Sequence, residues 1–274
     1  MSHRIAFVGG GNMATSLIGG LLARGTAPAA IVVADPDANQ RQRLQHAFGV
    51  ATVATATAAV EGTGTVVLAV KPQQMAEVSR SIAAQVQAAR ALVVSIAAGI
   101  RLRDIERWLG KGVPLIRTMP NRPALIGAGI TALFAAPDVG AASRQTAEAI
   151  MAACGPTVWV PAEDQIDVVT AVSGSGPAYF FLLVECLEAA GIELGLDPAT
   201  ARKLAIETAR GAGRMAAESP ESPAELRAQV TSKGGTTAAA LEVLEAAGVR
   251  GIFAAAVVAG ARRATALADE FGTL

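Results

Sequence analysis

A glycine-rich turn near the start of the chain has the residue spacing that binds a dinucleotide. The first glycine of such a turn permits a tight bend, the second lets the backbone approach a pyrophosphate, and a small residue three positions later lets helix and strand pack closely. The diphosphate charge then meets the positive end of the helix that follows. The pattern G-x-G-x-x-A after an apolar run predicts this site at residues Gly9, Gly10, Gly11, Asn12, Met13 and Ala14.

An acidic residue stands where it could select the cofactor. Asp35 follows the second apolar run, 26 positions beyond Gly9, and could accept a hydrogen bond from the adenosine ribose, which favours NADH slightly. A turn or helix cap in the stretch up to Asp37 would explain it as well. Arg41 and Arg43 follow within reach of a 2′-phosphate, so the sequence leaves the choice between NADH and NADPH open.

Two segments at the ends of later apolar runs are further cofactor candidates. Open α/β sheets bind ligands at the carboxyl ends of their strands, so a lysine there could contact the cofactor, and a later strand end should lie beside the nicotinamide. A plain strand end or turn is the alternative for both. The segments are Ala69, Val70, Lys71 and Pro72, and Met119, Pro120 and Asn121.

Side chains that could exchange a proton with a hydroxyl substrate are scarce. His3 and His46 are expected at the surface, and the one tyrosine, Tyr179, is expected to pack rather than act as an acid. Hydroxy-acid dehydrogenases usually need such a group. An imine does not, because it can already carry its proton and accept hydride as an iminium, so that positioning and charge complementarity suffice.

A second glycine-rich turn runs into a helix in the last part of the chain. Its backbone N–H groups and the positive helix end would form an anion pocket suited to a substrate carboxylate. A bare helix N-terminus with a capping threonine is the alternative. The turn comprises Ser232, Lys233, Gly234, Gly235, Thr236 and Thr237.

The elements that position these residues fall into two domains. Short β-branched runs alternate with amphipathic stretches up to Pro161, and everything after it has a helical pattern. We expect an α/β fold, with an N-terminal Rossmann-like doubly wound sheet (a dinucleotide-binding domain, residues 1–162) followed by an all-α C-terminal dimerisation domain (residues 163–274) that also binds substrate. The predicted strands are residues 4–8, 31–34, 65–70, 92–96, 114–118, 130–135 and 157–160.

The helical part carries clear helix starts and an unusually apolar end. Asp197 before Pro198 predicts an N-cap, and the spacing from Ser222 to Glu225 predicts a capping box. Small residues at 173–176 should interrupt the first long helix. The last helices, at 236–247 and 250–271, are apolar around much of their circumference, so we expect them to bury against another subunit.

Bulk composition narrows the possible partners. Lys+Arg and Asp+Glu balance at 23 each, so no net field gathers nucleic acid. The longest apolar stretches, at 91–100 and 251–260, are short of the roughly 20 residues that span a bilayer, so no membrane partner is expected. The start leaves no room for a signal peptide, which predicts a cytoplasmic protein. Cys154 and Cys186 lack metal-ligand spacing and are expected to be two buried thiols.

Three segments together resemble the pyrroline-5-carboxylate reductase family over essentially the whole chain. They are residues 223–242, which include the loop T-S-x-G-G-x-T, residues 171–179 and residues 117–121, with residues 69–73 as a less specific fourth. The resemblance implies hydride transfer from NADH or NADPH to 1-pyrroline-5-carboxylate, giving L-proline as the last step of proline biosynthesis. It also implies that Ser232, Gly235, Thr236 and Thr237 hold the substrate carboxylate and that the Thr237 hydroxyl hydrogen-bonds the ring nitrogen. The helical domains are expected to assemble a dimer, and often a decamer built from dimers.

The chain departs from the family's common pattern, and two other functions stay open. Lys233 stands where a proline is frequent, and Asp35 where many relatives have a short polar residue. A β-hydroxyacid dehydrogenase shares the plan of domains, but it needs a lysine on the first long helix of the second domain, and residues 164–186 contain none. A non-catalytic dinucleotide sensor would bind nucleotide without oxidising it when the imino acid is added.

Overall fold

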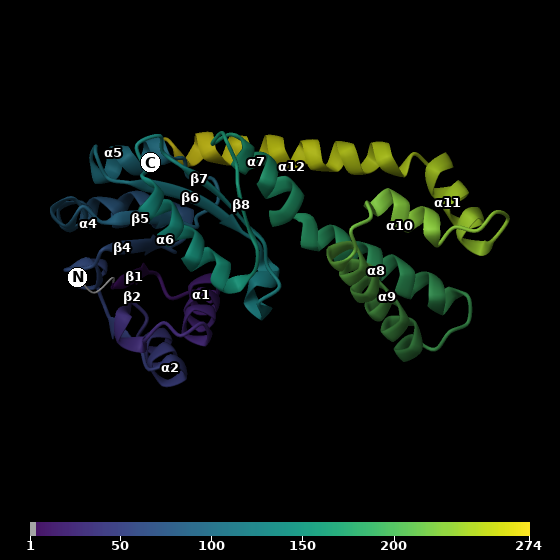
Figure 1. Cartoon of the computed structure of the whole chain (residues 1–274), viewed down its shortest axis with the longest axis horizontal. Helices are drawn as coiled ribbons and strands as arrows, with labels where there is room; N and C mark the ends of the chain where they lie inside the picture. Colours follow the sequence, from purple (N-terminus) through teal and green to yellow (C-terminus); the bar gives the residue numbers. More distant parts are fainter. Residues whose placement is uncertain (1–3) are drawn as a thin grey trace. The chain divides into compact units, whose positions relative to one another are not determined.

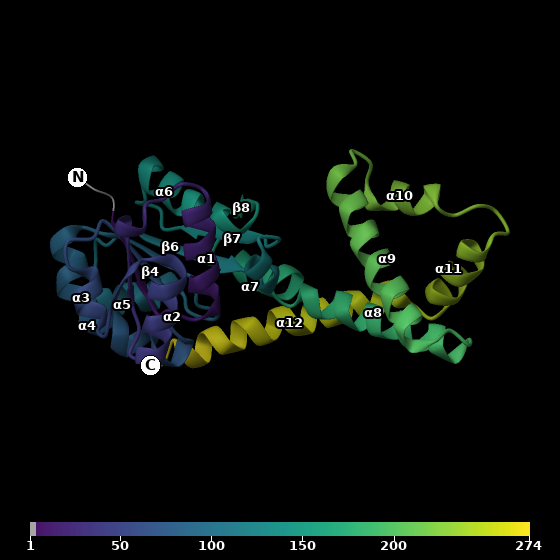
Figure 2. The same cartoon turned by 90° about the horizontal axis from the view of Figure 1, so that it is seen from below.

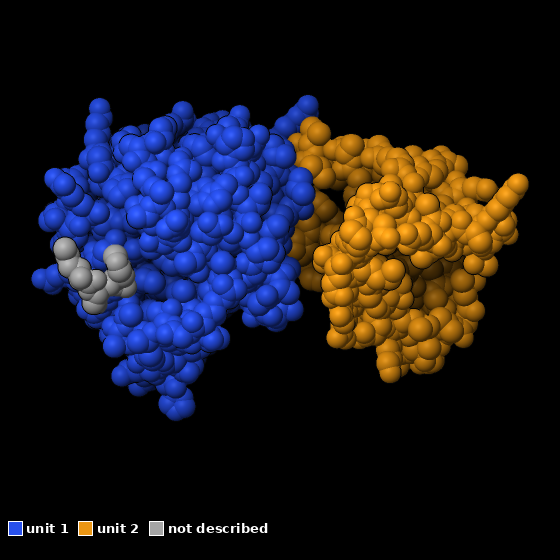
Figure 3. Space-filling view, in the orientation of Figure 1, with its two compact units in different colours: residues 1–174, 259–274 blue, residues 175–258 orange. Residues whose placement is uncertain are grey.

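The computed structural model describes residues 4–274 of the chain and divides into two compact units (Figure 3). Unit 1 comprises the chain up to Gly174 together with Ala259–Leu274, and unit 2 comprises Ser175–Val258. Unit 1 contains the sheet and unit 2 is helical, as the sequence predicts (Figure 1).

The sheet of unit 1 has eight strands in the order β3-β2-β1-β4-β5-β6-β7-β8, and every neighbouring pair is parallel except β6 and β7. β1, β2, β4 and β5 are buried along their whole lengths, because helices cover both faces and leave no side for polar residues. The strands are β1 (Ile5–Val8), β2 (Ile31–Ala34), β3 (Ala51–Val53), β4 (Thr65–Leu68), β5 (Leu92–Ser95), β6 (Leu115–Pro120), β7 (Thr131–Ala135) and β8 (Thr157–Trp159).

Helices pack on both faces of this sheet and form two separate hydrophobic cores (Figures 1 and 2). One core contains α1 (Asn12–Ala23), α2 (Ala38–Phe48) and α6 (Ala141–Met151), and the other contains α3 (Ala56–Val60), α4 (Met75–Ala89) and α5 (Leu102–Leu109). The short helices are η1 (Pro28–Ala30), η2 (Pro72–Gln74), η3 (Arg122–Ile126), η4 (Ala152–Cys154), α7 (Gln165–Val169) and the π-helical turn η5 (Thr170–Gly174).

The doubly wound sheet is confirmed, with three differences from the sequence prediction. β3 was not predicted, because it has only three residues, none of them buried. β7 runs antiparallel to β6, since residues 121–130 between them are fewer than the dozen or more that a parallel crossover needs. β6 extends to Pro120, so Met119 and Pro120 lie within the strand rather than after it.

Unit 2 holds α8 (Gly176–Glu193), α9 (Pro198–Glu218), α10 (Pro223–Gln229) and α11 (Thr236–Ala246), and α12 (Val249–Phe271) begins in it. The predicted caps are present: the Asp197 side chain accepts from the N–H groups of Ala199 and Thr200, and Ser222 and Glu225 form the capping box. The interruption predicted at residues 173–176 overlaps the π-helical turn that precedes α8.

Large apolar side chains of unit 2 face solvent in the single chain. Phe180 and Phe181 on α8 are 66% and 61% exposed. By length and composition alone, the stretches Gln165–Glu193 and Val249–Phe271 could cross a membrane, although core helices of water-soluble proteins pass the same test.

Cys186 on α8 is also exposed, so the expectation of two buried thiols is wrong for Cys186. It is correct for Cys154, which is buried.

The last part of α12 and the residues after it complete unit 1. Thr265 donates to the buried Asp167 carboxylate over 3.2 Å, and Arg101 pairs with Asp269 over 2.6 Å. Arg107 donates to the Gly272 carbonyl over 2.7 Å, and the ring of Phe271 packs beside Gly99. Residues 259–274 are therefore structural members of the sheet-containing unit.

Candidate active site

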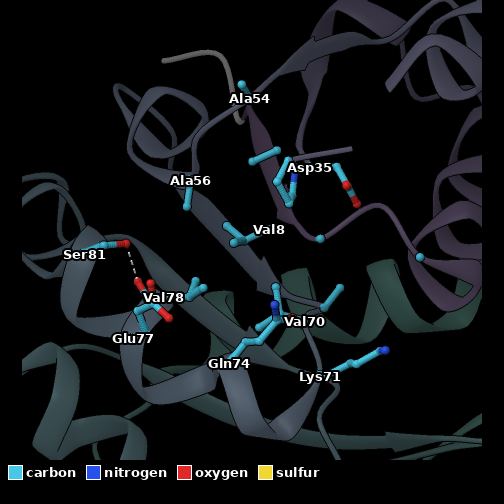
Figure 4. Close-up of a pocket in the computed structure, with 15 residues that line it drawn as sticks. Val8, Asp35, Ala54, Ala56, Val70, Lys71, Gln74, Glu77, Val78 and Ser81 are labelled. Atoms are coloured by element: carbon cyan, nitrogen blue, oxygen red, sulfur yellow. Dashed lines mark hydrogen bonds between the residues drawn. The ribbon is translucent and has the colours of Figure 1, made fainter. Parts of the chain in front are cut away.

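A pocket of about 420 Å³ lies in unit 1 at the carboxyl ends of β1, β2 and β4 (Figure 4). This is the edge at which a doubly wound sheet binds nucleotides. Several of the sequence-predicted cofactor residues line it together, from three separate segments of the chain: Gly9, Gly11, Asp35, Ala69, Val70 and Lys71.

The glycine turn that enters this pocket is shaped by its contact with the end of β4. Gly9 has a φ of +100°, and a Cβ placed on it would lie 2.6 Å from the Ala69 carbonyl oxygen. Only glycine avoids both the left-handed strain and the backbone collision. Gly10 is buried, and a Cβ on it would lie 2.7 Å from a methyl group of Leu44. The fold therefore requires glycine at position 9, whereas at position 10 a larger residue would have to displace the Leu44 side chain.

The third glycine of the turn has a different environment. Gly11 is exposed, has a φ of −64°, and a Cβ on it would meet nothing within 4 Å. It is the N-cap of α1, which Asn12 and Met13 begin, and no side chain among the described residues caps this helix. The first backbone N–H groups of α1 are thus available to an anion at the pocket. The buried Ala14 lets α1 pack against the sheet, as the motif predicts.

Asp35 joins the glycine turn to the loop after β2. Its Oδ2 accepts from the backbone N–H of Gly10 over 2.9 Å, and its Oδ1 accepts from that of Asp37 over 2.9 Å. Both interpretations of the sequence thus find support, because the carboxylate lines the pocket and also stabilises a turn. Arg41 donates through Nη1 to the carbonyls of Asp35 and Pro36, over 2.8 and 2.9 Å.

The segment after β4 provides the backbone against which Gly9 packs. The N–H of Ala69 donates to the Val8 carbonyl over 2.8 Å, which continues the strand pairing up to the pocket. Lys71 is exposed and precedes η2, which Pro72 begins. Its ammonium group is the one cationic side chain among the described lining residues.

The end of β6 is not among the residues that line this pocket. The Asn121 side chain is almost fully buried, donating to the Ser173 carbonyl over 3.2 Å and accepting from the Ile130 N–H over 2.9 Å. Met119 packs its methyl group against Gly174 in the π-helical turn. These contacts are structural, and the predicted place of Met119, Pro120 and Asn121 beside the nicotinamide stays a prediction.

A buried arginine on β6, a few residues before the end of the strand, pairs with two carboxylates, and the sequence analysis missed this network. Arg117 is 1% exposed and donates to Asp167 on α7 over 2.8 Å and to Glu163 over 3.3 Å. Glu163 also accepts from the Leu102 N–H over 2.7 Å at the start of α5. A single arginine inside an apolar strand was the available signal, because a buried guanidinium needs acidic partners.

The pocket also has lining residues without a recognisable motif. They come from the loop after β3, from α3, from η2 and from α4, which the parallel crossovers bring to the edge of β1 and β2. Small or apolar types predominate among them, so no pattern marked them in the sequence. They include Ala54, Ala56, Gln74, Glu77, Val78 and Ser81.

The second glycine-rich turn lies in unit 2, between α10 and α11. Gly234 has a φ of +69°, and Gly235 is the N-cap of α11, with its N–H donating to the Ser232 carbonyl over 3.0 Å. Thr236 and Thr237 are the first two residues of the helix. The turn-to-helix arrangement predicted from the sequence is therefore present, with Thr237 half-buried.

The described residues offer few histidines, metal ligands or reactive thiols for acid–base, metal or thiol chemistry. His46 is exposed on α2 as expected, and His3 lies outside the described residues. Within residues 4–274, no cluster of three or more His, Cys, Asp or Glu side chains could hold a metal. Burial raises the pKa of the Cys154 thiol, which keeps it protonated at neutral pH.

Two family models cover most of the chain. One described as pyrroline-5-carboxylate reductase dimerisation matches residues 163–267. Another, described as NADP oxidoreductase, coenzyme F420-dependent, matches residues 4–99. The apolar, solvent-facing helices of unit 2 thus fall within a domain whose description is dimerisation.

Curated and solved relatives extend over nearly the whole length. The pyrroline-5-carboxylate reductase of Pseudomonas aeruginosa is 46% identical over 269 residues, covering 98% of each chain. A solved pyrroline-5-carboxylate reductase from Coxiella burnetii is 41% identical, with a TM-score of 0.94 over 97% of this chain and 99% of its own. The pyrroline carboxylate reductase of Plasmodium falciparum, solved with NADP bound, is 25% identical, with a TM-score of 0.83 over 97% of this chain and 98% of its own. The chain belongs to the pyrroline-5-carboxylate reductase family.

Proposed function

We propose that this chain reduces 1-pyrroline-5-carboxylate to L-proline with hydride from NADH or NADPH, the last step of proline biosynthesis. The observation that carries this proposal is the pocket formed by the Gly9–Gly11 turn, Asp35 and the Ala69–Lys71 segment in a member of this family. The pocket supplies what a dinucleotide needs, and the family supplies the class of substrate.

The cofactor roles follow from the geometry of unit 1. The pyrophosphate would lie over Gly11 at the N-terminus of α1, where the exposed backbone leaves room and the helix end is positive. Asp35 would accept from the adenosine ribose, and Lys71 would offset phosphate charge. Alongside these we assign Gly9, Gly10, Asn12, Met13, Ala69, Val70, Pro72, Met119, Pro120 and Asn121 to the cofactor site.

The substrate roles are assigned to the turn before α11. Backbone N–H groups at Gly234 and Thr236, with the Ser232 hydroxyl, would hold the carboxylate at the positive end of the helix, and Gly235, whose own N–H donates to the Ser232 carbonyl, would shape the turn. The Thr237 hydroxyl would hydrogen-bond the ring nitrogen. The bound cofactor supplies hydride to the C=N carbon, and the nitrogen keeps the proton it already carries, so no side-chain acid is needed at that step.

The chain forms a homo-oligomer, in keeping with its dimerisation domain. We propose that residues 1–162 bind the dinucleotide, that residues 163–274 form the dimer and that dimers can assemble into a decamer. The exposed apolar faces of α8, α11 and α12 would then be covered by other subunits rather than by lipid. We place the enzyme in the cytoplasm, without a nucleic-acid partner.

The test is to follow oxidation of NADH and NADPH at 340 nm with and without 1-pyrroline-5-carboxylate, in Thr237→Val and Thr237→Ser. Valine keeps the shape but removes the hydroxyl, so kcat/KM for the imino acid should fall about 10- to 100-fold, the range of a hydrogen bond to a charged group. Serine should restore most of it, and cofactor affinity should stay unchanged in both. Equal kcat/KM in the two variants would remove the hydroxyl from the mechanism.

The two alternatives give different outcomes in the same assay. A dinucleotide sensor would bind nucleotide but show no oxidation with the imino acid. A β-hydroxyacid dehydrogenase would reduce NAD(P)+ with hydroxy acids and leave the imine unused. Near-full-length relatives named pyrroline-5-carboxylate reductases favour neither alternative.

A further inference from the structure

We infer that Asp35 makes this site prefer NADH to NADPH. The inference rests on the proposed function, because it concerns the cofactor of the same pocket. It goes beyond the comparisons, since the Plasmodium falciparum relative was solved with NADP and a matching family model is described as an NADP oxidoreductase. What carries it is how the carboxylate of Asp35 is held.

The Asp35 carboxylate is fixed from two sides. Its Oδ2 accepts from the Gly10 N–H, inside the phosphate-binding turn, and its Oδ1 accepts from the Asp37 N–H, each over 2.9 Å. Gly10 is buried, so moving the carboxylate away would leave a buried backbone donor without its partner. The charge therefore cannot easily leave the pocket wall to admit another anion.

The remaining hydrogen-bonding capacity of this carboxylate matches a hydroxyl. An ionised carboxylate only accepts, and each oxygen has a second lone pair beyond the bond to the backbone. A ribose 2′-hydroxyl can donate to it. A 2′-phosphate has no proton to donate in its fully ionised form, and its charge is repelled by the carboxylate.

Two cationic side chains follow Asp35 in the chain, but neither Arg41 nor Arg43 is among the described residues that line the pocket. Of the described lining residues, Asp35 and Glu77 are acidic and Lys71 is basic, which leaves a net charge of −1 (−1 − 1 + 1). Figure 4 shows all three among the lining side chains. Arg41 already donates to the Asp35 and Pro36 carbonyls, and Arg43 to the Gln40 side chain. NADPH would add further negative charge to an already acidic pocket.

The test compares dissociation constants of NADH and NADPH for the full-length oligomer, by calorimetry, alongside KM values from the 340 nm assay. The wild-type protein should bind NADH at least about tenfold more tightly, a ratio equivalent to ~1.4 kcal/mol. The ratio of the two dissociation constants should fall towards one as ionic strength rises, because salt screens the repulsion between the 2′-phosphate and the Asp35 carboxylate. Tighter or equal binding of NADPH would overturn the inference without any variant being needed.

Variants locate the effect. Asp35→Asn and Asp35→Ser remove the charge and should bring the NADH:NADPH ratio close to one, chiefly through tighter NADPH binding. Asp37→Asn is the matched control, since it removes an equal charge two residues away from a side chain that caps α2 and does not line the pocket. An Asp37→Asn shift as large as that of Asp35→Asn, or unchanged ratios in both Asp35 variants, would contradict the assignment to Asp35.

Failure of this inference is distinguishable from failure of the proposed function. If neither nucleotide binds, or both bind and neither is oxidised with 1-pyrroline-5-carboxylate, the proposed function is wrong. If the imino acid is reduced but NADPH is the better cofactor, only the preference assigned to Asp35 is wrong. Thermal unfolding of each variant checks that loss of the Gly10 contact has not unfolded unit 1.

Discussion

The turn after β1 offers two substitutions that differ by two positions and should have opposite consequences. At Gly9, an added Cβ would lie 2.6 Å from the Ala69 carbonyl oxygen and 2.8 Å from its carbon, at a φ of +100°. At Gly11, an added Cβ meets nothing within 4 Å, and φ is −64°. Gly9→Ala should therefore damage the fold, whereas Gly11→Ala should damage the cofactor site.

The magnitudes follow from these geometries. Left-handed backbone costs an alanine roughly 1–2 kcal/mol, and forcing a methyl group into packed atoms roughly 1–3 kcal/mol, so Gly9→Ala should lower the free energy of unfolding by about 2–5 kcal/mol. For Gly11→Ala, the loss of a good N-cap costs about 0.5 kcal/mol or more, offset by about 0.4–1 kcal/mol from the stiffer unfolded chain. Its stability should stay within about 0.5 kcal/mol of wild type.

Gly11→Ala should impair cofactor binding although it leaves stability almost unchanged. A methyl group where the backbone must approach the pyrophosphate should weaken NADH binding at least tenfold, or about 1.4 kcal/mol. Urea unfolding at one fixed protein concentration, because the chain is oligomeric, and NADH titration measure the two effects. Wild-type affinity in Gly11→Ala would refute the proposed path of the pyrophosphate, and wild-type stability in Gly9→Ala would refute the close contact with β4.

Three further outcomes are expected. Arg117→Met leaves the buried Asp167 carboxylate without its ion pair and should lower the free energy of unfolding by about 3–5 kcal/mol in urea, while the double variant with Asp167→Leu should recover most of the loss. Phe181→Asp puts a charge on the exposed apolar face of α8 and should reduce the mass measured by sedimentation, whereas an unchanged mass would exclude this face from the interface. Hydrogen bonds from Ser222 lower the pKa of Glu225, so the capping box stabilises the fold above the unfolded value of about 4.3 and is lost as pH falls through the lower folded value. The loss of thermal stability in Ser222→Ala should accordingly be seen at pH 7 and shrink in acid.

Local signals explain which parts of the fold were predictable. Runs such as Ile31–Ala34 are fully apolar and bounded by turns, and the caps at Asp197 and Ser222 depend on residues three positions away or fewer. β3 lacked such a signal because the strand has only three residues and none of them is buried. The direction of β7 depended on the length of a connection rather than on the pattern of the strand itself.

The candidate site was predictable where one segment contains the whole signal. The glycine turn does so, because its strand, its glycines and its helix are consecutive. The Arg117 network does not, since Asp167 is 50 positions away and Thr265 lies on α12, near the end of the chain. Lining residues such as Ala56 and Val78 reach the pocket only through the folding of the crossovers, and their side chains have no chemistry that a sequence pattern could reveal.

The return of α12 into unit 1 bears on how the protein is made on the ribosome. The final strand, β8, and the acidic partners of Arg117 are synthesised early, yet Thr265 and Asp269 emerge only after the 84 residues of Ser175–Val258. At 5–20 residues per second, translation of that insert takes about 4–17 s. During this interval the nascent nucleotide-binding unit lacks its last helix, so chaperones would meet it with the surface around Gly99 and Asp104 still uncovered.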